Sequence, residues 1–124
     1  MIRVFAASRR FTRFVAPVRT AARKLLTATG HRNGVVDIFI VGTDWMDTNV
    51  VSFPAPELFP RPDLPGQFLG EIYLNPLYIK AHGEDLHFML IHGFLHLLGY
   101  DHVRRSDRMT MERKERALMR AVRP

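Results

Sequence analysis

The sequence contains no cysteine among its 124 residues. A disulfide framework and a thiolate metal site are both excluded, so any zinc ion must be held by histidine, aspartate or glutamate. Long apolar runs are absent too, since no stretch approaches the roughly 18 residues that a membrane-spanning helix needs. With 47% hydrophobic and 24% charged residues, the composition is that of a globular protein. The length predicts a single domain, residues 1–124, with one core.

Acidic residues are missing from the first 36 positions, which hold eight Lys and Arg. Residues 37–103 hold nine acids and two bases, whereas residues 104–124 hold eight bases and three acids. The two ends of the chain therefore predict a basic surface around an acidic centre, and a polyanion such as RNA is the partner that this surface favours. Solvated helix faces explain the same pattern, and charge alone does not decide between the two.

The N-terminal segment has two interpretations. Residues 1–24 are rich in arginine and lack acids, which is also typical of organellar transit peptides. Against this, residues 2–5 predict a short strand, and the apolar positions that follow have helical spacing. Pro17 predicts a kink or a division of that helical region into two short helices. The apolar positions are Phe11, Phe14, Val15, Val18, Ala21, Ala22, Leu25 and Leu26.

The remaining elements follow from periodicity and turn residues. Branched and aromatic residues predict strands, and the five prolines of residues 54–66 predict an exposed loop. In the last helix, Ser106 or Asp107 is the expected N-cap, and Met111, Leu118 and Val122 form the apolar stripe. The expected strands are 35–42, 49–53 and 67–74, and the expected helices are 84–98 and 106–122, with a turn or short helix over 75–83.

Three of the six histidines lie within eleven residues, HGFLHLLGYDH. His92 and His96 are four apart on the expected helix, so their side chains lie one turn apart on one face. Gly99 tolerates the left-handed conformation that ends a helix, which allows His102 to return to the same point. Three neutral imidazoles leave one position of a tetrahedral zinc open, as in catalytic zinc sites. The other histidines (His31, His82 and His87) lack this spacing and are not expected to be ligands.

The residue after the first histidine is Gly93. Metzincin peptidases have the pattern HExxHxxGxxH, in which a glutamate at that position is the general base. A glycine cannot accept a proton, so the sequence disfavours peptide hydrolysis. Attack on an activated phosphodiester remains open, because zinc lowers the pKa of its water to about 7.

Residues 90–102, LIHGFLHLLGYDH, resemble the HGxLHLxGYDH signature of the YbeY endoribonuclease family of rRNA maturation factors. TNVVSFP, LGEI and MERKERAL are similar to further segments of that family, in the same order. The resemblance implies an α/β (α+β) domain with a small mixed sheet packed against helices and a central metal-binding helix. It implies a zinc-dependent enzyme that cuts single-stranded RNA, matures the 3′ end of small-subunit rRNA and serves ribosome quality control in the cytoplasm. His92, His96 and His102 would then hold one Zn²⁺, and the first helical region would bind RNA phosphates.

The chain departs from the family pattern before its SFP segment. The family has a segment similar to LNxxYRxxD there, whose arginine is assigned to catalysis, but residues 41–54 are too short to hold it and contain no arginine. The usual aspartate is Asn49. A guanidinium would stabilise charge on a phosphate, so we expect Arg61, or Arg104 and Arg105, to replace it. Asp101 is the second catalytic candidate, either as an acceptor that orients an imidazole or as a cap of the turn.

Two other functions stay open on the sequence alone. One is a non-catalytic RNA- or ribosome-binding protein with a structural metal, and the other is a metalloprotease. The expected partners are single-stranded or ribosomal RNA and the ribosome, without a membrane. The expected location is the cytoplasm, or an organellar matrix if the N-terminus is a transit peptide. The oligomeric state and the cleavage site are not predicted.

Overall fold

A computed structural model describes residues 1–56 and 61–123 of the chain. Four strands of these residues form one mixed sheet in the order β1-β2-β4-β3. β2 pairs in parallel with β1 and β4, whereas β3 runs antiparallel to β4. In chain order the elements are β1 (Ile2–Ala6), the 3-10 helix η1 (Arg9–Phe14), α1 (Val15–Ala28), β2 (Gly34–Ile40), β3 (Val50–Pro54), β4 (Gln67–Leu74), α2 (Pro76–Ala81), α3 (Leu86–Leu97) and α4 (Arg105–Val122).

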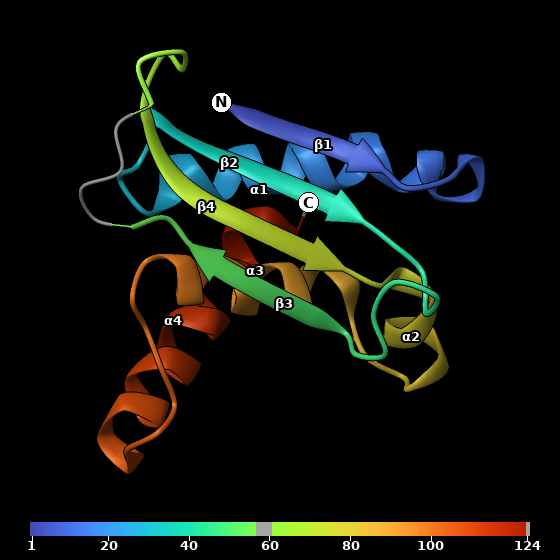
Figure 1. Ribbon diagram of the computed structural model, residues 1–124. Coiled ribbons are helices and arrows are strands. Elements are labelled where there is room, and N and C mark those ends of the chain that lie inside the picture. The colour runs from blue at the N-terminus through green and yellow to red at the C-terminus, as the bar shows by residue number, and fades with distance from the viewer. Residues whose placement is uncertain (57–60, 124) are drawn as a thin grey trace.

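The helices gather on one face of the sheet, as Figure 1 shows. α3 lies at the centre, where it contacts β3 and β4 on one side and α1 and α4 on the other. Apolar side chains of β2, β4, α1 and α3 meet between the layers and are buried, among them Leu25, Ile38, Ile72, Ile91 and Phe94. The predicted α+β domain with a small mixed sheet and a central helix is confirmed.

The other face of the sheet carries a row of aromatic rings. Phe5, Phe39 and Tyr73 occupy matching positions on β1, β2 and β4. Their rings stack on one another with centroids 5.2 and 4.7 Å apart. Phe53 of β3 meets Tyr73 edge-on at 5.7 Å. These contacts join all four strands on the face that the helices leave uncovered.

The N-terminal segment belongs to the folded domain. β1 pairs with β2 along its whole length, and the predicted apolar positions of α1 are buried in the core, except that Val15 is only partly buried against it. Pro17 is the third residue of α1, where the backbone N–H has no helical partner, so it fits without a kink. The helical region is divided into η1 and α1, but between Phe14 and Val15 rather than at Pro17, and α1 continues for 14 residues. Where the protein resides in the cell stays a prediction.

The structure corrects the expected start of the last helix. α4 begins at Arg105 with Arg104 at the N-cap, so the prediction that Ser106 or Asp107 caps it was wrong. The side chain of Arg104 makes no capping hydrogen bond. In the predicted proline-rich loop, residues 61–66 lie outside any helix or strand, and residues 57–60 fall outside the described residues. Within the described ranges, no helix has both the length and the apolar composition needed to cross a membrane.

Candidate metal centre

The first two histidines of the site project from α3. This helix begins with Asp85 as its N-cap, whose carboxylate accepts a hydrogen bond from the backbone N–H of Phe88 at 3.0 Å. Its apolar side chains face the sheet and α1, whereas His92 and His96 are half-buried at the margin of the core. Because the two histidines are four positions apart in the sequence, both imidazoles lie on the same side of the helix.

A turn after α3 brings the third histidine back to the other two. Gly99 has a φ of 94°, a left-handed conformation that side chains with a Cβ rarely adopt. The carboxylate of Asp101 then accepts a hydrogen bond from the backbone N–H of Val103 at 3.2 Å, which closes a short turn around His102. The spacing of histidines and glycine thus has the geometric role that the sequence predicted for it.

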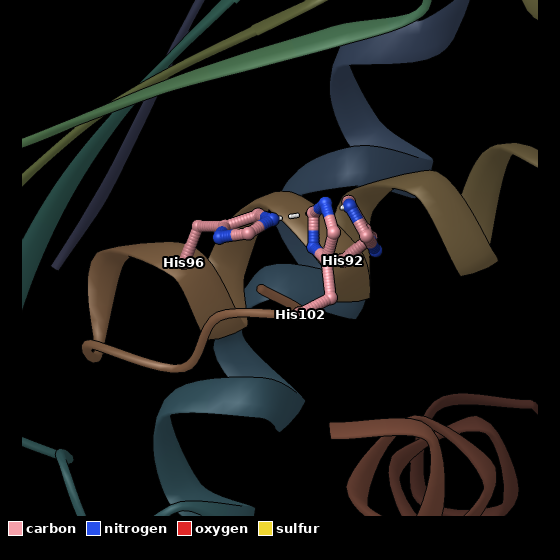
Figure 2. Close-up of side chains that lie close together, drawn as sticks. All are labelled: His92, His96 and His102. Atoms are coloured by element: carbon pink, nitrogen blue, oxygen red, sulfur yellow. Dashed lines mark hydrogen bonds between the residues drawn. The ribbon is translucent and has the colours of Figure 1, made fainter. Parts of the chain in front are cut away.

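The three imidazoles converge on one point, as Figure 2 shows. One nitrogen from each ring lies within 4.8 Å of the others, and Nε2 of His92 is 3.1 Å from Nε2 of His96. Two ligands 2.0–2.1 Å from a tetrahedral zinc would lie roughly 3.3 Å apart, so this separation is close to that of a zinc site. The donor set therefore fits a metal ion that accepts three nitrogen ligands.

Glu115 of α4 orients the first of these rings. Its side chain is buried, with 5% of the residue exposed, and Oε2 lies 2.9 Å from Nδ1 of His92. A carboxylate only accepts, so this contact places the proton of the neutral ring on Nδ1 and leaves the lone pair of Nε2 directed at the cluster. Hydrogen bonding of a ligating histidine to a carboxylate fixes its tautomer and raises its basicity.

The environment of His96 favours its neutral form. Burial lowers the pKa of this imidazole, and the neighbouring His92 and His102 lower it further, against an opposing contribution from the backbone of Tyr100. A metal ligand must be deprotonated, so a lowered pKa prepares His96 for a cation.

Two hollows adjoin the cluster on different sides. The first, of about 390 Å³, is lined by all three histidines together with Val50 and Ser52 of β3, Phe88 and Met89 of α3, and Asn49. The second, of about 220 Å³, is lined by His92, His102 and residues of α4: Arg108, Met111, Glu112 and Glu115. A substrate can therefore approach the imidazoles from the β3 side or from the α4 side.

The glycine at position 93 has a packing reason. A Cβ at this position would lie 2.8 Å from Cγ2 of Val50 and 2.9 Å from Oγ of Ser52. The hydroxyl of Ser52 also donates to the carbonyl oxygen of Gly93 at 2.7 Å. α3 and β3 are thus too close for a side chain here, and the glutamate of the metzincin pattern would not fit.

Neither of the two residues predicted to be catalytic lines a hollow beside the imidazoles. Arg61 donates to the carboxylate of Asp63 at 3.0 Å and lies over the ring of Phe68, in a hollow next to Leu97 and Gly99. Neither hollow beside the histidines has Arg61 in its lining. Asp101 is exposed and caps the turn, which was one of its two expected roles. A catalytic role for either residue stays a prediction.

Glu115 was not predicted from the sequence. The signal was present, because Glu115 lies four residues after Met111 and three before Leu118, within the stripe expected to face the core. A carboxylate on an apolar helix face needs a buried partner, and a histidine is one of the few candidates.

Comparison with known proteins agrees with this geometry. Residues 42–123 match the family model described as endoribonuclease YbeY. The chain is 35% identical over 124 residues to endoribonuclease YbeY of Anaeromyxobacter sp., and the alignment covers 84% of this chain and 62% of that protein. It is 39% identical over 82 residues to the Rhizobium etli protein of the same name, covering 58% of this chain and 46% of the relative. The chain thus spans about half to three fifths of the length of these relatives.

Among solved structures, the solution structure of a protein from Thermotoga maritima has the same fold. The TM-score is 0.58 with 23% sequence identity, and the match covers 98% of this chain and 89% of the other.

Proposed function

Because this chain belongs to the YbeY endoribonuclease family, we propose that it is a zinc-dependent endoribonuclease that cuts single-stranded RNA. The proposed substrate is ribosomal RNA, at the 3′ end of the small-subunit species, and the proposed roles are rRNA maturation and ribosome quality control in the cytoplasm. The observation that carries the proposal is the convergence of three imidazoles within 4.8 Å beside two open hollows.

His92, His96 and His102 would hold the ion, with Glu115 fixing the tautomer of His92. When bound, zinc supplies a Lewis acid for a phosphate oxygen and a water of lowered pKa. Three protein ligands leave a position open for that water or for the substrate, which distinguishes a catalytic from a structural zinc site.

Basic side chains of the two chain ends supply a surface for the RNA backbone. α1 packs against α4, and Arg23 and Lys24 of α1 line a shallow hollow together with Ala121 of α4. The two basic ends therefore lie side by side, which supports the polyanion-binding surface expected from the charge pattern. Phosphate contacts of this kind give affinity without base specificity.

A non-catalytic RNA-binding protein with a structural metal is the second candidate. It is favoured by the lack of arginine in residues 41–54 and in the lining of the β3-side hollow. A metalloprotease is disfavoured, because Gly93 supplies no base and its surroundings leave no room for one.

The test is cleavage of a single-stranded fragment from the 3′ end of small-subunit rRNA by zinc-loaded protein, with His96→Ala as the matched variant. We expect cleavage by the wild type, none by the variant, and little on a duplex of the same sequence. Binding without cleavage would identify the non-catalytic alternative, and hydrolysis of casein would identify a protease. Full cleavage by a zinc-free His96→Ala variant would contradict the proposal.

A further inference from the structure

The hollow on the α4 side of the histidines contains one basic side chain. Arg108 shares this hollow of about 220 Å³ with His92 and His102. The hollow is several times larger than the roughly 30 Å³ that a water molecule occupies in the liquid. It thus places a guanidinium and two of the three imidazoles around a common space that is open to solvent.

The periodicity of α4 explains why Arg108 points there. Met111, Glu115, Leu118 and Val122 form the buried face of this helix, and Arg108 precedes Met111 by three residues. Residues three and four apart lie on one face, so Arg108 continues the buried stripe by one turn toward the N-terminus. The apolar part of the stripe packs into the core, and Arg108 at its start lines the same hollow as His92 and His102.

Within the described residues, the guanidinium of Arg108 forms no ion pair with a carboxylate. Arg108 is exposed, and among residues 1–56 and 61–123 it forms no ion pair and no side-chain hydrogen bond. Arg3, Arg61 and Arg123 are instead each paired with an aspartate. Two acids share the hollow with Arg108, but the carboxylate of Glu115 is engaged with His92. The carboxylate of Glu112 is exposed and repels an anion in the hollow. Binding of a phosphate there therefore requires that the positive charge of Arg108 and the metal outweigh this repulsion.

We propose that Arg108 binds the RNA phosphate that reacts at the histidine cluster, an inference that rests on the proposed nuclease function. A guanidinium stays protonated in proteins and presents a planar fork of N–H donors that matches two phosphate oxygens. Donors placed where negative charge increases in the transition state accelerate phosphoryl chemistry. Of the arginines considered from the sequence, neither Arg61 nor Arg104 nor Arg105 lines either hollow beside the histidines.

Three variants isolate this role. Arg108→Ala removes the guanidinium, and Arg108→Lys keeps the charge without the fork. Arg113→Ala is the matched control, because Arg113 is an exposed arginine of the same helix, about 140° further round its axis, and lines neither hollow. Arg108 and Arg113 are both exposed, so none of the three substitutions removes a buried side chain, and zinc content per chain checks that the metal centre is intact in each.

The deciding measurement is the affinity of zinc-loaded protein for inorganic phosphate, followed by ³¹P NMR. We expect Arg108→Ala to weaken it roughly tenfold or more, Arg108→Lys to weaken it less, and Arg113→Ala to leave it unchanged. Cleavage of the single-stranded rRNA fragment should fall about 100-fold in Arg108→Ala, mainly in kcat.

The outcomes separate this inference from the proposed function. Equal phosphate affinity in wild type and Arg108→Ala, at equal zinc content, overturns the role of Arg108 whether or not the wild type cleaves RNA. Weaker phosphate binding in Arg108→Ala, with a wild type that leaves RNA intact, supports Arg108 as the anion-binding residue and contradicts the nuclease proposal.

Discussion

Oε2 of Glu115 lies 2.9 Å from Nδ1 of His92, although the two residues are 23 positions apart and belong to different helices. The contact joins α4 to α3 at the point where α3 carries the first expected metal ligand. It also makes the orientation of His92 depend on the packing of the C-terminal helix. The candidate metal centre therefore depends on the whole fold rather than on residues 92–102 alone.

Replacement of Glu115 by alanine should lower zinc affinity by about 10- to 100-fold, because His92 loses the acceptor that fixes its tautomer. Glu115→Gln keeps an acceptor oxygen and should lose less. A competition assay with a zinc chelator measures both, with Arg116→Ala as the control, because Arg116 is an exposed residue of the same helix that lines neither hollow beside the histidines. Unchanged zinc affinity in Glu115→Ala would show that this contact does not support the site.

Gly93→Ala should destabilise the protein by about 1–3 kcal/mol, because the added methyl overlaps Val50 and Ser52 of β3. The sign of the change in the free energy of unfolding is informative, because alanine is favoured over glycine by about 1 kcal/mol in an unconstrained helix. Urea unfolding gives the free energy of unfolding. In the double variant with Val50→Ala, the two losses should be less than additive, and a stabilising Gly93→Ala would refute the close approach of α3 and β3.

Asp85 makes stability depend on acid pH. Burial alone would raise the pKa of this carboxyl, but the hydrogen bond from the Phe88 N–H and the Arg123 guanidinium hold it below its ordinary value of 3.8. The unfolded chain therefore binds the proton more readily, so the stabilisation from Asp85 is present above about pH 4 and is lost as the pH falls through the lowered native value.

Asp85→Asn removes this titration. The free energy of unfolding should fall less steeply below pH 4 in Asp85→Asn than in the wild type, as measured by urea unfolding across that range. At pH 7, Asp85→Ala should cost about 1 kcal/mol because the helix loses its cap. Parallel pH profiles for wild type and Asp85→Asn would contradict the assignment.

The basic surface of α1 is tested by salt dependence. The variant Arg23→Ala with Lys24→Ala should weaken binding of single-stranded RNA regardless of sequence. It should also reduce the slope of log affinity against log salt by roughly 0.7 for each phosphate that the protein no longer neutralises. Lys80→Ala is the control, because Lys80 is an exposed base of the acidic central segment. An unchanged slope would place the RNA on another face.

Local features of the fold and site were predictable from the sequence. The spacing of His92, His96 and His102 around Gly99 follows from the geometry of one helix and its end, and the structure brings these rings together. The strand over 67–74 was predicted with its observed bounds, because its apolar pattern is strong and turn residues precede it.

Long-range features were not predictable in the same way. The partner of His92 depends on how α3 and α4 cross, which residue spacing does not encode. Arg61 was selected as an arginine of the proline-rich loop, but its guanidinium pairs with Asp63, two residues away, and lies over the ring of Phe68. The N-cap of α4 was misplaced because Ser106 and Asp107 are stronger capping residues than Arg104, and the fold starts the helix before them.

The metal centre is tested most directly by the zinc content of purified protein, measured by mass spectrometry for the wild type and for His92→Ala, His96→Ala and His102→Ala. We predict one zinc ion per wild-type chain and none in each variant. Circular dichroism should show that each variant retains the fold. A wild type that binds no zinc, or variants that keep a full equivalent, would contradict the proposed centre.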